Sequence, residues 1–153
     1  VEGCPDKMDC NIATMEIVSA VEEWDNNCAV TLDWIEKDGT IRIIPQGRDK
    51  NEIFYGLPET ILGGGGKPIL SIRFKSAFGD IYYDKGHDWV IRSQTEYDAS
   101  LRRVILHEVG HALGIDHSSN KKSVMWPENT APEVEKLSGE DIRVCNLLYN
   151  AKR

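Results

Sequence analysis

The sequence is dominated by one segment, residues 107–117, which reads HEVGHALGIDH. His107 and His111 are four residues apart, so a helix would place both imidazoles on one face, within reach of a single metal ion. Gly114 permits a positive φ, which would end the helix sharply and let His117 approach from another direction as a third ligand. Three neutral imidazoles with an open fourth position form the ligand set of a catalytic zinc ion.

Glu108 is the predicted general base of this segment. A carboxylate within the apolar arc of a helix is costly without a partner, and a zinc-bound water would supply one. Zinc lowers the pKa of that water towards 7, so Glu108 would take its proton and later pass it to the leaving amine. The segment therefore predicts peptide hydrolysis without a covalent enzyme intermediate. A structural zinc site is the alternative, but it normally has a fourth protein ligand, and only Asp116 is a nearby candidate.

Outward from this segment, the chain has the pattern of an α+β domain. Apolar residues at helical spacing predict three helices, and β-branched or alternating runs predict strands between the first two. A long Gly- and Pro-rich stretch, residues 47–68, is expected to be a surface loop. The predicted helices are Ile12–Trp24 with Asn11 as N-cap, Ser100–Leu113 with Asp98 or Ser100 as cap, and Ser138–Tyr149; the predicted strands are Ala29–Ile35, Thr40–Ile44 ended by Pro45, Ile69–Phe74 and Ile81–Tyr83.

Composition restricts the class of protein and its partners. The chain has 153 residues, of which 41% are hydrophobic and 28% are charged, which is typical of one globular domain. Its 18 basic and 25 acidic residues give a net charge of −7, which disfavours nucleic acid as a partner. Since no apolar run approaches the roughly 18 residues of a transmembrane helix, no membrane partner is expected either.

The four cysteines indicate an oxidising compartment. None belongs to a C-x-x-C pair, so a cysteine zinc site is not expected. An even number of scattered cysteines favours two disulfides, and four buried thiols are the alternative.

The active-site segment resembles that of the metzincin zinc endopeptidases. Ser118 directly after the third histidine, and the sequence SVMWP at residues 123–127, resemble the matrixin branch of that clan. By this likeness Met125 is the methionine of the turn that packs beneath the metal. The resemblance extends over nearly the whole chain, through Ala20–Trp24, Val30–Trp34, Gly39–Ile43, Gly79–Asp84 with Trp89, and Leu137–Ile142 with Leu148 and Tyr149.

The resemblance implies a single metalloprotease domain over residues 1–153. Its fold would be a twisted five-stranded sheet with three helices, divided into an upper subdomain (about 1–114) and a small lower subdomain (about 115–153). The substrate cleft would lie between them. An extended peptide would pair with an edge strand at Leu70 and Ser71. Trp126 and Pro127 would wall the pocket for the side chain after the scissile bond, with a hydrophobic preference.

Two metal sites of the family are altered in this sequence. The positions of the histidines for a second, structural zinc hold Ile72 and Tyr82, so we expect one catalytic zinc ion and no second one. Asp84 keeps the position of a calcium ligand, but the usual glutamate three residues later is His87.

Calcium binding is therefore left open by the sequence. Asp80, Asp84 and Asp88 would offer oxygen ligands to a hard cation. Solvated surface acids are the alternative for the same three residues.

The resemblance also makes the cysteines unusual, because the catalytic domain of the family normally has none. Of the three possible pairings we favour Cys4–Cys10, which closes a short loop, together with Cys28–Cys145, which ties the first helix to the last. Two such disulfides would replace stabilisation lost with the structural zinc.

The sequence thus predicts a secreted, monomeric zinc endopeptidase that acts on proteins or peptides. One alternative is a catalytically silent module that holds zinc or a peptide. Another is a different metzincin family, against which Ser118 and the lack of a tyrosine two residues after Met125 argue.

Overall fold

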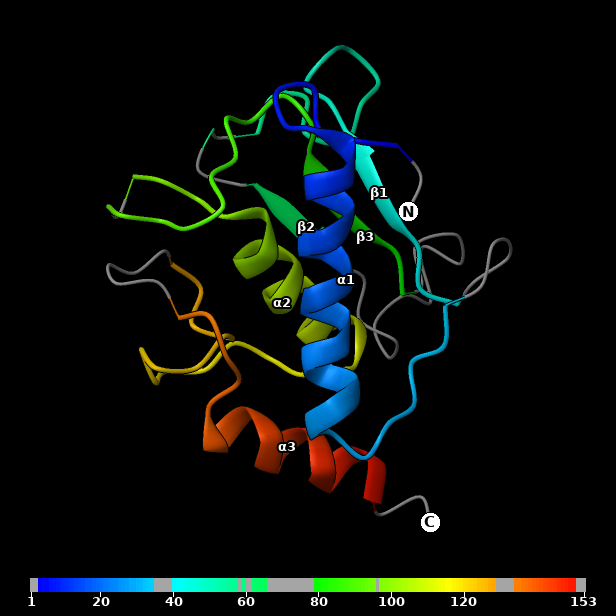
Figure 1. The fold of residues 1–153 in the computed structure, drawn as a ribbon, viewed down its shortest axis with the longest axis vertical. Coiled ribbons are helices and arrows are strands. Elements are labelled where there is room, and N and C mark those ends of the chain that lie inside the picture. Colours follow the sequence, from blue (N-terminus) through cyan, green and yellow to red (C-terminus); the bar gives the residue numbers. More distant parts are fainter. Residues whose placement is uncertain are drawn as a thin grey trace.

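The computed structural model describes residues 3–34, 40–57, 59, 62–65, 79–95, 97–128 and 134–150. Three helices accompany a small mixed sheet, which confirms the α+β class. Figure 1 shows α1 lying lengthwise beside the sheet and α2, with α3 across their lower ends. In chain order the elements are α1 (Cys10–Asn27), β1 (Ile43–Gln46), β2 (Gly63–Gly65), β3 (Ile81–Asp84), α2 (Leu101–Ala112) and α3 (Gly139–Asn150).

Helix α1 begins two residues earlier than the sequence predicted. Its N-cap is Asp9 and not Asn11, because the Asp9 carboxylate accepts hydrogen bonds from the backbone N–H groups of Asn11 (2.9 Å) and Ile12 (3.2 Å). The buried face includes Ile17 and Trp24, seven residues apart. Trp24 Nε1 donates to the backbone carbonyl of Leu106 at 2.9 Å, which fixes α1 against α2.

The sheet has the strand order β1-β3-β2 among the described residues. Strand β1 runs parallel to β3 with Ile43 opposite Ile81, and β2 runs antiparallel to β3 with Gly63 opposite Tyr83. Pro45 lies inside β1 and does not end it, contrary to the prediction. Among the described residues β1 is an edge strand, and proline is tolerated where the outer side of a strand needs no ladder donor.

Strand β2 lies within the stretch that was predicted to be a surface loop. A Cβ atom at Gly63 would lie 2.6 Å from Val104 Cγ1 of α2. Only glycine therefore permits the close approach of this strand to α2, and a glycine inside a strand marks such an approach. The prediction of a loop was wrong for Gly63–Gly65 because glycine carries little β propensity of its own.

The strand predicted at Ala29–Ile35 is not formed over residues 29–34. Backbone donors in this stretch are taken by side chains: the N–H of Ala29 donates to Asn146 Oδ1 (2.8 Å) and that of Leu32 to Asp25 Oδ1 (2.7 Å). The strand predicted at Ile69–Phe74 lies outside the described residues.

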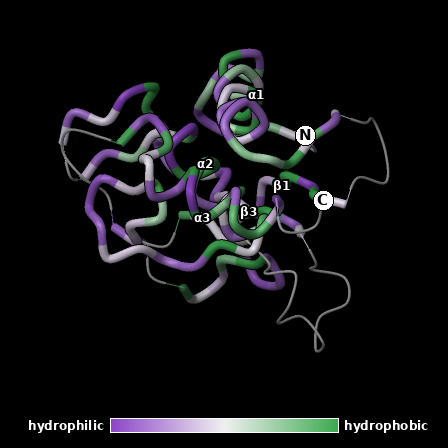
Figure 2. Tube along the Cα trace, turned by 90° about the horizontal axis from the view of Figure 1, so that it is seen from below, coloured by the Kyte–Doolittle hydropathy of each residue, from purple (hydrophilic) through white to green (hydrophobic). Residues whose placement is uncertain are grey.

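Both predicted disulfides are confirmed. Cys4 is bonded to Cys10, and Cys28, the C-cap residue of α1, is bonded to Cys145 of α3. The core lies between α1, α2 and the sheet. Figure 2 shows long hydrophilic stretches along the peripheral loops and both kinds of residue around the axis of α1. In the described part of the chain, no helix is long and apolar enough to cross a bilayer.

Candidate active site

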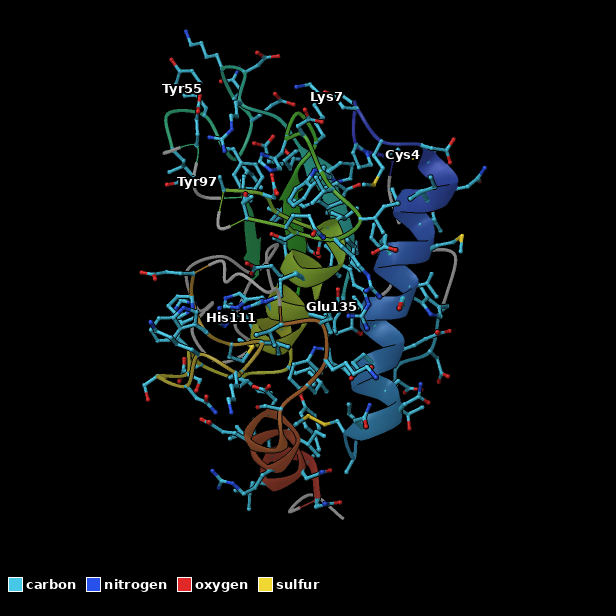
Figure 3. The ribbon with its side chains drawn as sticks, turned by 60° about the vertical axis from the view of Figure 1, so that its left-hand side comes forward. Cys4, Lys7, Tyr55, Tyr97, His111 and Glu135 are labelled. Atoms are coloured by element: carbon cyan, nitrogen blue, oxygen red, sulfur yellow. A yellow bond between two sulfur atoms is a disulfide. The ribbon has the colours of Figure 1, made fainter. Side chains whose placement is uncertain are left out.

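Helix α2 presents the first two histidines. Ser100 Oγ accepts from the N–H of Arg103 at 3.1 Å and caps the helix, as one of the two predicted caps. The helix ends at Ala112, and Gly114 follows with φ +93°, as the sequence predicted. This turn brings His117 back to α2, and Figure 3 shows His111 on the side of α2 that faces away from α1.

The three histidines converge. His117 Nε2 lies 3.1 Å from His107 Nε2 and 3.1 Å from His111 Nε2. Nitrogens bound to zinc at 2.0–2.1 Å with tetrahedral angles lie about 3.3 Å apart. Within the described residues, the same three side chains form a group that would hold a metal ion, and His117 is exposed to solvent. The donor set and its spacing therefore fit one zinc ion.

Backbone carbonyls orient two of these rings. His107 Nδ1 lies 2.8 Å from the carbonyl oxygen of Val124, and His111 Nδ1 lies 2.8 Å from that of Ile115. A carbonyl only accepts, so each Nδ1 must carry the proton and each Nε2 presents its lone pair to the metal. Burial lowers the pKa of His107 to about 3, which keeps its imidazole neutral, as a metal ligand must be.

Glu108 is buried beside the histidines, with 6% of its surface exposed. Burial raises its pKa to about 8, against an opposing effect of the Arg103 cation. Its Oε2 atom is buried and makes no hydrogen bond in the structure. An unpartnered carboxylate oxygen on the helix that also carries His107 and His111 fits a group whose partner is a water or substrate atom at the metal.

Met125 packs against the middle of α2. The residue is fully buried, and a Cβ atom at Gly110 would overlap its sulfur atom. Its carbonyl accepts from the N–H of Ser118 at 3.0 Å, so Met125 is tied to the residue that follows the third histidine. Met125 thus packs against α2, the helix that carries His107 and His111.

The sequence analysis did not assign Asp141 to the site. Asp141 is 2% exposed and accepts hydrogen bonds from Ser123 Oγ, from the N–H of Val124 (3.1 Å) and from the N–H of Ser138 (2.7 Å). Since the Val124 carbonyl orients His107, the first turn of α3 holds the turn that positions a ligand. Burial distinguishes this acid from its neighbour Glu140, which is half-buried.

Strand β2 is a second feature that the sequence did not assign to the site. A Cβ atom at Gly63 would lie 3.1 Å from Glu108 Oε1, so this edge strand passes beside the predicted base. Leu70 and Ser71, the predicted substrate-binding residues, lie outside the described residues. Trp126 is half-buried with Lys121 Nζ 5.5 Å from its ring centroid, and Pro127 is exposed.

The acids of the possible calcium site are not all solvated, so that alternative is wrong for two of them. Asp84 is 4% exposed, and its Oδ2 lies 2.6 Å from Arg48 Nε. Asp80 is 2% exposed and pairs with Arg42 at 2.5 Å, whereas Asp88 is exposed. Because a guanidinium already neutralises Asp84, the residues as placed do not fit calcium there.

Comparison with known proteins agrees with this site. The sequence model of the matrixin family matches residues 4–150. A probable matrix metalloproteinase of Invertebrate iridescent virus 3 is 39% identical over 51% of the chain and 22% of its own length. Macrophage metalloelastase of Rattus norvegicus is 37% identical over 48% of the chain and 16% of its own length. A putative matrix metalloproteinase of Trichoplusia ni ascovirus 2c is 32% identical over 76% of the chain and 24% of its own length.

The chain matches about a fifth of the length of these relatives. The family match, in contrast, includes nearly the whole chain, from the first cysteine to the end of α3. It includes the three histidines, the buried glutamate and the methionine turn. The chain therefore belongs to the matrixin family, the zinc endopeptidases that its histidine segment resembles.

Proposed function

We propose that this chain is the catalytic domain of a zinc-dependent endopeptidase. The observation that carries the proposal is the convergence of three imidazole Nε2 atoms, together with a buried, unpartnered carboxylate oxygen on the helix that carries two of them. His107, His111 and His117 would hold one zinc ion, and Glu108 would act on the substrate. Family membership and the names of the relatives support the same function.

The zinc ion and Glu108 would have different roles in peptide hydrolysis. A bound zinc ion would polarise the carbonyl of the scissile bond and lower the pKa of a water molecule. Glu108 would accept the proton of the attacking water and return it to the leaving amine. Burial alone raises its pKa to about 8, and the positive charge of a bound zinc ion would lower that pKa, so that Glu108 would be charged and able to accept a proton.

The substrate would bind as an extended peptide beside the sheet. Strand β2 is an edge of the described sheet and passes next to Glu108, which supports pairing of the peptide with this edge by β-augmentation. Leu70 and Ser71 remain further predicted contacts of the substrate. The stretch that begins at Met125 and includes Trp126 and Pro127 would wall the pocket after the scissile bond, with a hydrophobic preference.

The remaining features of the proposal concern the whole domain. We propose one domain with an upper part of about 1–114, a lower part of about 115–153 and the substrate cleft between them. A five-stranded sheet would complete the upper part. We propose one zinc ion per chain, and Arg48 in place of calcium as the partner of Asp84. The two disulfides support a secreted, extracellular protein, and we expect a monomer.

A peptide library with metal analysis tests the function. We expect one zinc ion per chain, cleavage that stops when a chelator removes the metal, and recovery when one equivalent of zinc is restored. Cleavage before large apolar residues would support the proposed pocket. Peptide binding without turnover at full zinc occupancy would instead support a silent binding module and overturn the proposed activity.

A further inference from the structure

Two consecutive arginines of α2 bind the segment that leaves the methionine turn. Arg103 Nη2 donates to the backbone carbonyl of Trp126 at 3.1 Å, directly after Met125. Arg102 Nη1 donates to the backbone carbonyl of Glu135. Both arginines lie about one turn before His107 on the same helix, so α2 contacts the chain at Trp126 and again at Glu135.

The burial of Arg103 restricts its side chain and so fixes its hydrogen bond to the Trp126 carbonyl. The residue is only 5% exposed, which is rare for an arginine without a specific role. A hydrogen bond from a buried cation to a carbonyl is stronger than one between neutral groups, and its loss leaves the part-buried Trp126 carbonyl without this donor. The position of the Trp126 carbonyl therefore depends on Arg103.

Arg102 is held from the other side by α1. Its Nε donates to Ser19 Oγ at 3.1 Å, and its Nη2 lies 3.7 Å from Glu23 Oε2. Glu23 also accepts from the N–H of Leu137 at 3.2 Å. This end of the segment is thus bound to two helices.

We propose that Arg103, supported by Arg102, is a positioning residue that sets the pocket for the substrate side chain after the scissile bond. The inference rests on the proposed function, in which Trp126 forms part of the wall of that pocket. Neither arginine would touch the reacting atoms. Arg103 would act through the backbone at Trp126, and Arg102 through the backbone at Glu135. Together they would fix the distance between the pocket wall and α2, the helix that carries His107 and His111.

Selectivity is the readout that separates this role from general stabilisation. If the pocket wall is displaced, large apolar side chains, which fill the pocket, should fit less well. We therefore expect kcat/KM to fall more for substrates with such a side chain after the scissile bond than for substrates with alanine there. For Arg103→Met we expect the ratio of kcat/KM for leucine to kcat/KM for alanine to fall about tenfold. This is the effect expected from the loss of one charge-assisted hydrogen bond. The change should appear mainly in KM, with zinc content unchanged. Arg103→Lys should restore part of the ratio, and Arg102→Met should lower it less.

Arg92→Gln is the matched control. Arg92 lies 3.4 Å from the Glu135 side chain and is 72% exposed, so it contacts the same segment from the solvent and not through its backbone. The control should keep the wild-type selectivity. If Arg103→Met lowers kcat/KM equally for all substrates, or leaves the ratio unchanged, the positioning role is overturned.

Hydrogen–deuterium exchange gives a second readout that needs no activity. Arg103→Met should speed exchange of the amides of residues 124–128 at least about tenfold, and Arg102→Met that of 134–138, while α1 stays protected. If the wild-type protein cleaves no peptide, the proposed function fails, but these exchange rates still test the two contacts. Unchanged exchange in both variants would contradict the inference directly.

Discussion

Burial acts in opposite directions on the two ionisable neighbours His107 and Glu108. It lowers the pKa of the imidazole to about 3 and raises that of the carboxyl to about 8. Both groups are therefore mainly neutral at pH 7 without metal. The neutral imidazole of His107 has a free lone pair for zinc. The Glu108 carboxyl ionises more easily when a positive group at the metal site compensates for the loss of hydration on burial.

The raised pKa of Glu108 predicts how the metal-free protein responds to pH. The folded state binds a proton up to about pH 8, whereas the carboxyl of the unfolded chain releases it near its ordinary pKa of 4.5. The folded state therefore holds more protons between these values, and its stability falls as the pH rises through this window. Glu108→Gln removes the dependence, so it should raise the melting temperature by a few degrees at pH 8.5 and change it little at pH 5.

Thermal unfolding in the presence of a chelator checks this prediction. Glu22→Gln, at an exposed position of α1, removes the same charge without burial and should have little effect at either pH. An equal change for Glu108→Gln at both pH values would show that its carboxyl does not titrate in the expected window.

The sequence predicted local features of the site better than those that depend on the fold. The histidine spacing, the glycine turn and the neighbouring glutamate are all within eleven residues, so their relation is fixed by one helix and one turn. Asp141, Arg102 and Arg103 resemble ordinary charged residues of helices. Their roles depend on burial against distant segments, which single-sequence patterns do not report.

At the scale of elements, helices were predicted well because their apolar periodicity is strong. The strand predicted at 29–35 failed over residues 29–34 for a reason invisible in the local sequence: the N–H of Ala29 is satisfied by Asn146, 117 residues away. Strand β2 was missed for the opposite reason. Its glycines disfavour a strand locally, but the approach of α2 requires them.

Gly63→Ala tests the close approach of β2 to α2. A Cβ atom there would lie 2.6 Å from Val104 Cγ1 and 3.1 Å from Glu108 Oε1. We expect a loss of about 1–3 kcal/mol in the free energy of unfolding, as for other overpacked sites, together with lower peptide-cleaving activity.

The neighbouring glycine supplies the control. A Cβ atom at Gly64 would meet nothing within 4 Å, so Gly64→Ala should change the unfolding free energy by about 0.5 kcal/mol or less. Urea unfolding of both variants measures the difference. Equal stability of the two variants would contradict the packing of β2 on α2.

At the scale of the whole molecule, the Cys28–Cys145 disulfide joins the end of α1 to α3 over a separation of 117 residues. The same helix carries Asp141, which holds the turn behind His107. A crosslink over so long a loop stabilises the fold mainly by restricting the unfolded chain, by about 4–5 kcal/mol in the chain-entropy view. It therefore links the metal-binding turn to the rest of the domain.

Removing each disulfide separately tests this link. Replacing Cys28 and Cys145 by serine should lower the free energy of unfolding by about 2–5 kcal/mol and weaken zinc retention. Replacing Cys4 and Cys10, which are only 6 residues apart, should have a smaller effect and leave zinc binding unchanged. Equal losses from the two double variants, measured by urea unfolding and chelator competition, would contradict the account.

The rate of peptide cleavage by the zinc-loaded Glu108→Ala variant tests the central claim most directly. Glu108 is predicted to move the proton, while His107, His111 and His117 hold the metal. The variant should therefore keep one zinc ion per chain and lose at least about a hundredfold in kcat/KM, the contribution of a general acid–base group. A zinc-loaded variant that cleaves peptides at the wild-type rate would contradict the assigned role of Glu108.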